Sequence, residues 1–368
     1  IYRAPGHNAM QRATLGFCGI GPVRVTAFGS VLKSDAEQRG KWLEKARLEG
    51  QRLRGAVPTL MERLLRTLRD WLTALRLQFY LTTWIAYAIG ALAASGSGAL
   101  ATRTFWIGYA VLFLIEAATV FTNEVVDYPA DVLNKRYGPF NGGSRVIVDG
   151  RLSRAELQLA AWIASGMAAL LAAILAFYTA APPGASLVLL AAVLVLAIAY
   201  TAPPLKLSYR TLGELDVGFT HGPAVLVCGW VFLGGAWYDP LPWLMGLPIG
   251  LAILPSIILA NIPDREADAV VGKCTIAVRF GQRTAIMSAM VATGIAAASA
   301  LTWPYLDGIP RGYVLVPWLA LPHALWLLSL LARSLRTEGV PTNMMTLMLA
   351  SLTYVLWFLL PPFVALLI

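Results

Sequence analysis

The sequence predicts an all-α, polytopic membrane protein with about nine transmembrane helices. Of its 368 residues, 58% are hydrophobic and only 13% are charged, whereas a soluble domain carries about 25% charged residues. After residue 76 the chain consists of successive apolar segments, each long enough to cross a bilayer, which takes about 20 residues. Composition and segment length together exclude an ordinary soluble enzyme.

Residues 1–76 are predicted to form a separate, cytoplasmic N-terminal extension. They hold 14 of the 29 Lys and Arg residues and no long apolar run. A signal peptide is not expected, because no compact apolar core follows a basic start. Residues 35–54 are predicted to form a charged, exposed helix. The extension could also dock a protein partner.

An amphipathic helix is predicted at 59–77, where apolar residues recur at helical spacing between arginines. Such a helix suits the membrane surface before the first span. Packing against the protein's own cytoplasmic loops is the alternative that the pattern leaves open. The apolar residues are Leu60, Leu64, Leu68, Trp71, Leu72 and Leu75, and the arginines are Arg63, Arg66, Arg69 and Arg76.

Residues 77–368 are predicted to form the transmembrane domain, in which the fifth and sixth spans have the softest boundaries. The spans are expected near 78–97, 104–123, 155–180, 185–203, 214–235, 242–262, 284–303, 312–332 and 343–366.

Lys and Arg residues are distributed unequally among the loops. With the N-terminus inside, the cytoplasmic loops 124–154, 204–213, 263–283 and 333–342 hold 13 of them, and the outer loops hold only Arg103 and Arg311. Positive charge collects in cytoplasmic loops, so this orientation is expected, in a cell membrane or an organelle inner membrane. The same rule explains the net charge of +9, and no nucleic-acid partner is expected.

Cysteine and histidine residues are too widely spaced to suggest a disulfide framework or a zinc site. They are Cys18, Cys228 and Cys274, and His7, His221 and His323.

Two acidic stretches, NEVVDYPAD and NIPDREAD, occur where predicted spans reach the cytoplasm. Their spacings place the acids of each stretch along one helical face. Neighbouring carboxylates repel each other unless a cation joins them, and Mg²⁺ binds a few carboxylates together with substrate phosphates. The stretches therefore predict Mg²⁺ ions that hold a diphosphate, and a solvated helix end is the alternative for either stretch alone. The residues are Asn123, Asp127 and Asp131 in the first stretch, and Asn261, Asp264 and Asp268 in the second.

Three cytoplasmic loops add basic residues that could stabilise a leaving diphosphate. NGGSR places Arg145 after a glycine pair, YTAPPLK places Lys206 after a proline pair, and GKCTIAVRFG contains Lys273 and Arg279. The positive-inside distribution is the competing explanation for each of them. Arg145, Lys206 and Lys273 are the diphosphate-binding candidates.

These residues resemble the motifs of the UbiA-type intramembrane prenyltransferases. The resemblance covers most of 76–368 and rests on NxxxDxxxD at 123–131, DxxxD at 264–268, their placement after the second and sixth spans, and the span count. It implies helices around a central, lipid-accessible cavity capped by cytoplasmic loops. It also implies that Mg²⁺ helps to bind an isoprenyl diphosphate, whose chain passes to an acceptor that is commonly an aromatic ring. The metal ligands would then be Asp127, Asp131, Asp264 and Asp268, with Asn123 and Asn261 beside the diphosphate.

Within this family, the segments 142–153, 209–223 and 272–281 look most similar to the menaquinone-pathway branch, which prenylates dihydroxynaphthoate. YTAPPLKL is similar to the chlorophyll-synthase branch. Many members carry Tyr-x-x-x-Lys after the fourth span, whereas Tyr200 and Lys206 are six residues apart here. Glu124 stands where the family often has Asp.

Tyr200 and Lys206 are the catalytic candidates, because an aromatic face stabilises a cation and a lysine stabilises a leaving anion. The apolar interior would hold the prenyl tail and exclude water. Glu116, Asp216 and His221 lie within predicted spans. They could face the cavity or bond to neighbouring helices.

Three other functions stay open. A UbiA-type terpene cyclase would need the same motifs, and only an acceptor-dependent product separates it from a transferase. A transporter would place its acids near the membrane midplane, whereas these acids lie at the cytoplasmic ends. A structural subunit would not need the full set of acids.

Overall fold

The part of the chain that the structure describes is helical, with no strand. The computed structural model describes residues 35–56, 60–179, 181–336 and 339–368. The chain divides into two compact units, residues 1–67 and residues 68–368. The first unit contains the polar helix α2 (Ala36–Ala56), and α3 (Leu60–Leu75) begins in the first unit and ends in the second.

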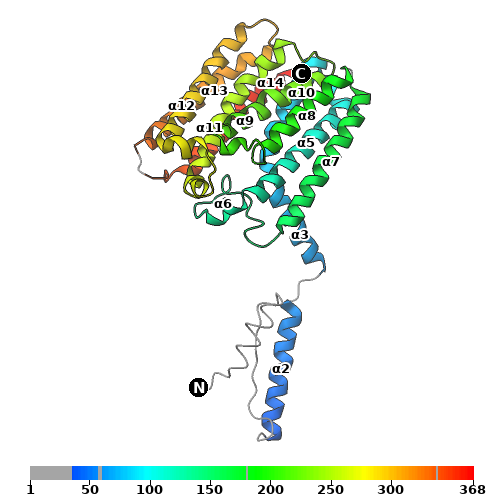
Figure 1. Cartoon of the computed structure of the whole chain (residues 1–368), viewed down its shortest axis with the longest axis vertical. Helices are drawn as coiled ribbons and strands as arrows, with labels where there is room; N and C mark the ends of the chain where they lie inside the picture. The colour runs from blue at the N-terminus through cyan, green and yellow to red at the C-terminus, as the bar shows by residue number, and fades with distance from the viewer. Residues whose placement is uncertain (1–34, 57–59, 180, 337–338) are drawn as a thin grey trace. The chain divides into compact units, whose positions relative to one another are not determined.

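The second unit is a bundle of apolar helices (Figure 1). Among the described residues, eight helical segments are long and apolar enough to cross a membrane, and α8 is a shorter apolar helix. Each of the predicted spans coincides with one of these segments. They are α4 (Tyr80–Ser95), α5 (Arg103–Val126), α7 (Arg154–Tyr178), α8 (Pro183–Ala199), α9 with α10 (Gly213–Phe219 and Val225–Phe232), α11 (Pro240–Val270), α12 (Ile276–Thr302), α13 (Val316–Ser334) and α14 (Met344–Leu367).

Local sequence explains where several of these helices begin. Ser153 and Glu156 form a capping box at the start of α7, and the Thr275 side chain accepts a hydrogen bond from the Val278 amide at the start of α12. Asp239 caps α11, whose first residue is Pro240, a position where a helix does not need the missing N–H.

Glycines allow α4 and α10 to pack backbone against backbone. A Cβ added at Gly90 would overlap the Leu226 carbonyl oxygen, and one added at Gly229 would overlap that of Tyr87. Small residues bring helices together in this way inside membranes, where burial of apolar surface supplies little driving force. The two helices belong to the main buried core of the second unit.

A π-helical turn, Thr220–Ala224, joins α9 to α10. Pro223 lies within it and has no N–H to donate, so the regular ladder of hydrogen bonds is interrupted. Turns of this kind occur frequently at functional sites. The sequence predicts one unbroken span here, and the π-turn is the difference that the structure adds.

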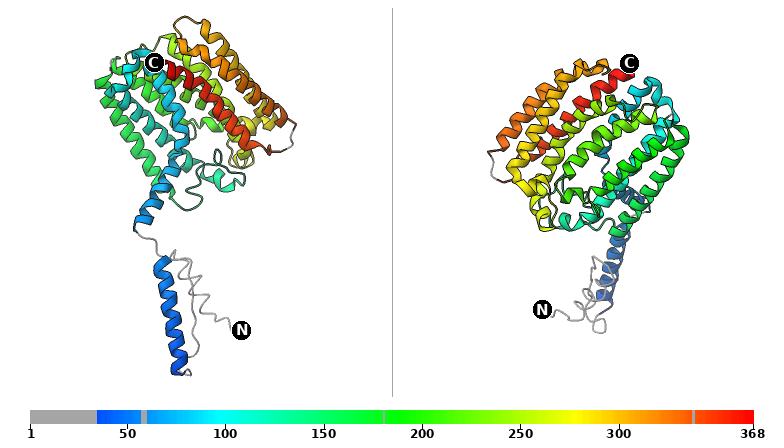
Figure 2. Two further views of the ribbon diagram at one scale, coloured as in Figure 1. Left: turned by 180° about the vertical axis from the view of Figure 1, so that it is seen from behind. Right: turned by 45° about the horizontal axis from the view of Figure 1, so that its top comes forward.

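The acidic stretches lie at the ends of long helices. α5 ends at Val126, Asp127 caps it, and the short helix α6 (Tyr128–Leu133) follows directly. α11 extends to Val270, well beyond the predicted end at 262, so the second stretch is helical throughout. Figure 1 and the left view of Figure 2 place α6 at the end of the bundle away from the C-terminus.

Candidate active site

Both acidic stretches line one cavity, although they come from distant parts of the chain. The cavity has a volume of roughly 1750 Å³, its open mouth included. Helices α4, α5, α8, α11 and α14 and the α9–α10 segment all contribute to its wall. Eight of the predicted site residues line it, namely Asn123, Asp127, Asp131, Tyr200, Asn261, Asp264, Asp268 and Lys273.

Lys273 lies between carboxylates of the two stretches. Its Nζ is 2.8 Å from Asp127 Oδ2 and 4.0 Å from Asp268 Oδ1. Burial by itself lowers the pKa of Lys273, but the carboxylates of Asp127 and Asp268 outweigh it, and the pKa lies well above its ordinary value. The cavity therefore contains a permanent positive charge beside the acids.

Asp131 is a buried acid that lies directly beneath the glycine pair. Burial, assisted by the nearby Glu124 and Asp127, raises its pKa to about 8. A Cβ added at Gly143 would overlap Oδ2 of Asp131, and Gly143 has a φ of 68°, in the left-handed region. Only glycine meets both conditions without strain, so the glycine pair brings the loop backbone close to the acid.

Asp264 ties α11 to the loop that follows α6. Its Oδ1 accepts hydrogen bonds from the side-chain amides of Asn134 at 2.8 Å and Asn141 at 2.6 Å, and its Oδ2 accepts one from the Gly142 amide at 3.0 Å. Both oxygens of this predicted metal ligand are therefore already engaged by the protein. The two asparagines follow no periodic pattern, and the sequence alone did not single them out.

The two motif asparagines bond to neighbouring polar side chains. Asn123 Oδ1 accepts a hydrogen bond from the Thr201 hydroxyl at 2.5 Å. Asn261 Nδ2 donates to Glu214 Oε1 at 3.1 Å, and the same oxygen accepts from the Ile276 amide at 2.9 Å. The first bond ties α5 to the turn after α8, and the other two tie α11 and the start of α12 to Glu214 of α9.

Arg145 and Lys206 are not among the residues that line the cavity. The Arg145 guanidinium donates to the backbone oxygen of Asp131 at 2.9 Å and lies 3.9 Å from the centre of the Tyr137 ring. Lys206 Nζ lies 4.5 Å from the centre of the Tyr209 ring. Both have positive φ, 62° and 46°, so the loop conformation directs each side chain to an aromatic neighbour.

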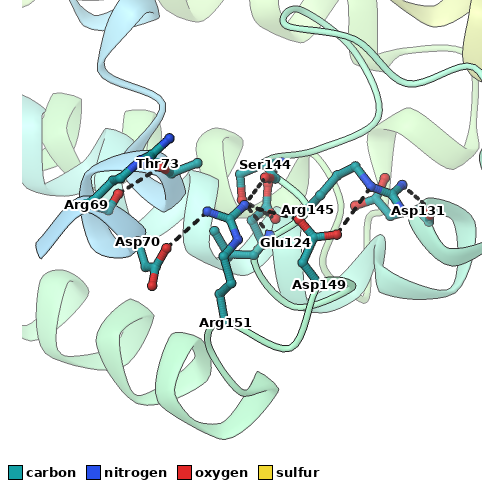
Figure 3. A network of polar contacts seen from close by, with 10 residues as sticks. Arg69, Asp70, Thr73, Glu124, Asp131, Ser144, Arg145, Asp149 and Arg151 are labelled. Carbon is teal, nitrogen blue, oxygen red and sulfur yellow. Dashed lines mark hydrogen bonds and ion pairs between the residues drawn. The ribbon is translucent and has the colours of Figure 1, made fainter. Parts of the chain in front are cut away.

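A second polar network holds the loop that contains the glycine pair, residues 134–153 (Figure 3). Glu124 accepts hydrogen bonds from the Ser144 amide at 2.6 Å and the Ser144 hydroxyl at 2.7 Å. Arg151 forms an ion pair with Asp70 at 3.1 Å and donates to the Ser144 carbonyl at 3.3 Å. The end of α3 therefore packs on the loop between α6 and α7, and packing on the protein's own loops is the alternative that the amphipathic pattern left open.

Glu116, Asp216 and His221 also line the cavity. His221 Nε2 is 3.8 Å from Glu116 Oε1, so this pair joins α5 to the π-helical turn. All three residues therefore face the cavity, and Glu116 and His221 lie opposite each other at a distance beyond that of a hydrogen bond.

The described residues do not form a compact metal site by themselves. No three His, Cys, Asp or Glu side chains in this part of the chain lie close enough together to hold an ion alone. The carboxylates instead surround a space that is shared with Lys273 and the glycine pair. Such an arrangement suits an ion that takes part of its coordination from a bound anion.

The sequence is similar to those of known proteins. Residues 82–352 match the family model described as the UbiA prenyltransferase family. A UbiA prenyltransferase domain-containing protein 1 from Dictyostelium discoideum is 33% identical over 87 residues, which are 24% of this chain and 26% of that protein. The chain thus matches about a quarter of the length of that relative.

Solved structures share the fold. A UbiA homolog from Archaeoglobus fulgidus, bound to GPP and Mg²⁺, has a TM-score of 0.57 and 15% identity, over 79% of this chain and 99% of that one. The structure of a digeranylgeranylglyceryl phosphate synthase has a TM-score of 0.57 and 17% identity, and the match covers 82% of this chain and 99% of that one. At these identities the likeness establishes the fold.

Proposed function

The chain belongs to the UbiA prenyltransferase family, and from this premise we propose that it transfers an isoprenyl chain from a prenyl diphosphate to an aromatic, quinone-precursor acceptor within the membrane. One observation carries the proposal. Carboxylates from α5–α6 and from α11 line the same cavity, with the Lys273 ammonium between Asp127 and Asp268. The Archaeoglobus fulgidus homolog was solved with GPP and Mg²⁺, which supports the same ligands here.

The acidic side chains fit Mg²⁺. Asp127 Oδ1 and Asp268 Oδ2 are buried and have no hydrogen-bond partner among the described residues. Mg²⁺ prefers oxygen ligands and usually takes one or two carboxylates beside substrate phosphates. Asp127, Asp131 and Asp268 would bind the ion. Asp264 would also bind it, after one of its carboxylate oxygens gives up a hydrogen bond from an amide. When bound, the ion would neutralise charge on the diphosphate.

The chain's own residues would bind, orient and shield the substrates. Lys273 would take up charge as the diphosphate separates from the prenyl C1 atom. Tyr200 lines the cavity, and its ring would stabilise an allylic cation. Ile253 and Leu352 belong to the apolar wall that would hold the tail and exclude water, which would otherwise quench the cation.

The remaining predicted residues would act by positioning the acidic side chains. Arg145 would hold Asp131 through its backbone oxygen, and Asn123 and Asn261 would position the helix ends that carry the acids. Lys206 would reach the diphosphate only after leaving the Tyr209 ring.

We also propose dihydroxynaphthoate as the acceptor. The segments 142–153, 209–223 and 272–281, which resemble the menaquinone-pathway branch, support this choice. The basic loops support a site that opens toward the cytoplasm. Membrane lipid would surround the bundle, and the N-terminal extension would be the segment available to a protein partner.

The decisive experiment measures transfer by the purified full chain in lipid nanodiscs. We expect a prenylated ring from Mg²⁺, labelled geranylgeranyl diphosphate and dihydroxynaphthoate. Asp127→Asn and Asp268→Asn are each expected to lower kcat by about 100-fold or more, because each removes charge that the bound ion needs.

Asp307→Asn is the matched control, because Asp307 is an exposed acid outside the cavity. Near-normal turnover by Asp127→Asn would contradict the site. A labelled hydrocarbon that forms without any ring acceptor would indicate a cyclase instead.

A further inference from the structure

The cavity contains a second polar group, distinct from the acids at its mouth. Glu116 precedes Asn123 by two helical turns of α5, about 10 Å along the axis. Tyr80, Asp216 and His221 line the same cavity from α4, α9 and the π-helical turn. None of the four residues belongs to the acidic motifs, and the proposed handling of the diphosphate does not use them.

Two of these side chains are buried without a partner. Tyr80 is 4% exposed and Asp216 is 8% exposed. Tyr80 Oη and Asp216 Oδ1 have no hydrogen-bond partner among the described residues. An unsatisfied buried polar atom destabilises a protein, because it has lost its bonds to water and gained none in return. A cavity that retains two of them is suited to a ligand that carries its own donors and acceptors.

The Glu116–His221 pair is oriented to accept a proton. His221 Nδ1 is 3.1 Å from the Val217 carbonyl oxygen, which can only accept, and 3.1 Å from the Thr220 hydroxyl, which already donates to the Asp216 carbonyl oxygen at 2.7 Å. We therefore assign the hydrogen of the ring to Nδ1. The lone pair of a neutral ring is then on Nε2, which is 3.8 Å from Glu116 Oε1. The Glu116 side chain is 13% exposed and that of His221 is 30% exposed, so both remain accessible from the cavity.

We propose that the Glu116–His221 pair accepts the proton of a ring hydroxyl on the aromatic acceptor, and that Tyr80 and Asp216 bind the same polar ring. This inference rests on the proposed function. The ligand class is a hydroxylated aromatic ring, which lies between the pair and the prenyl C1 atom. Two turns of α5 separate the pair from the diphosphate end, which leaves room for such a ring.

The step balances without any further reactant. The hydroxyl proton passes to the pair, and the ring carbon ortho or para to that oxygen forms a bond to prenyl C1. The bond between C1 and the diphosphate oxygen breaks, and the diphosphate leaves with the electron pair. The proton on the attacked ring carbon is then lost, the hydroxyl is restored, and one proton is released overall. If the attacked carbon carries a carboxylate, CO₂ leaves in place of that proton.

The test compares acceptors of different acidity in Glu116→Gln and His221→Asn. With dihydroxynaphthoate we expect kcat to fall by about 100-fold or more in Glu116→Gln, the usual size of a general-base effect. The KM for geranylgeranyl diphosphate should stay unchanged. A halogenated ring whose hydroxyl ionises unaided should recover most of the lost rate, because it no longer needs a proton acceptor.

Thr119→Ala is the matched control, because Thr119 lines the same cavity on α5 but its hydroxyl bonds to the Ile115 carbonyl of its own helix. Glu116→Asp keeps a carboxylate and should retain more activity than Glu116→Gln. If the wild type transfers prenyl groups but both Glu116→Gln and His221→Asn keep normal kcat, the inference is overturned and the proposed function stands. Lost activity that the acidic ring does not recover also overturns it. If the wild type prenylates no ring at all, the proposed function itself fails.

Discussion

At the residue scale, the site depends on buried charges that compensate one another. Lys273 and Asp127 are each nearly buried, with side chains 10% and 14% exposed, and their 2.8 Å contact places a cation among acids. Removal of one partner of a buried pair costs more than the pair contributes, because it leaves an uncompensated charge. Replacement of Lys273 alone would therefore destabilise the cavity before any substrate binds.

Asp131 gives the stability of the protein a predictable dependence on pH. Burial, with Glu124 and Asp127 nearby, raises the pKa of Asp131 to about 8, whereas an unfolded chain has an Asp pKa of about 3.9. Between these values the folded protein binds the proton more tightly, so its stability falls as pH rises. Mg²⁺ needs the ionised carboxylate, so we expect its stabilising effect to be larger at about pH 8.5 than at about pH 6.

Thermal unfolding followed by tryptophan fluorescence, with and without Mg²⁺, measures this difference. Asp131→Asn should remove most of it. An Mg²⁺-induced shift of equal size at both pH values in the wild type would count against the assignment of Asp131.

Residue types and spacing predicted the acids, because repeated carboxylates beside a membrane are costly unless they serve a function. Lys273 was predicted only as one of three basic loop residues, on the same grounds as Arg145 and Lys206. Asn134 and Asn141, which hold Asp264, were not predictable, since isolated loop amides carry no pattern. Arg145 and Lys206 illustrate the opposite case. Their charge was visible in the sequence, but their left-handed backbone, which sends them to tyrosine rings, was not.

At the element scale, the glycine-rich loop and the helix ends form the site together. Asp264 of α11 holds the loop through Asn141 and Gly142, and Glu124 of α5 holds it through Ser144. The span positions were predictable from hydropathy alone. The π-helical turn was not, because a single proline inside an apolar run does not reveal how the backbone will adjust.

Gly143→Ala tests whether close backbone approach at this loop matters. The new methyl group would overlap Oδ2 of Asp131, so we expect the Mg²⁺ concentration for half-maximal activity to rise by about tenfold, the equivalent of about 1.4 kcal/mol. Activity titrated against Mg²⁺ measures this change.

Gly150→Ala supplies the control. Gly150 has the same φ of 68°, but a Cβ there meets nothing within 4 Å. Both substitutions carry a similar backbone cost of about 1–2 kcal/mol, and only Gly143→Ala should change the Mg²⁺ requirement. Equal behaviour of the two variants would show that backbone strain alone is responsible.

At the scale of the whole molecule, the chain brings the two acidic motifs into one cavity, and the hydrogen bond between Asn134 and Asp264 joins residues that are 130 positions apart. The repetition of the acidic motif predicted that the two stretches meet in one site. Helical periodicity could not predict this, because it shows only which residues share a face of one helix. The orientation of the bundle in a membrane remains a prediction from its basic loops.

Removal of residues 1–59 should leave the chemistry intact. All the cavity-lining residues lie at Arg76 or beyond, and the contact between Asp70 and Arg151 would be retained. We expect kcat and KM to change by less than about twofold, because changes at the surface, away from the buried core and the site, alter stability by only about 0.5 kcal/mol. Steady-state transfer assays of the shortened chain decide this, and an inactive product would show that the extension helps to build the site.

The glycine contacts between α4 and α10 restrict how substrates can travel. Two helices that touch through their backbones cannot separate or slide without losing contacts along the whole seam. A prenyl chain that moves laterally between the lipid and the cavity must therefore pass between a different pair of helices. Bulkier residues placed along that other route would slow entry and release while leaving the chemical step unchanged.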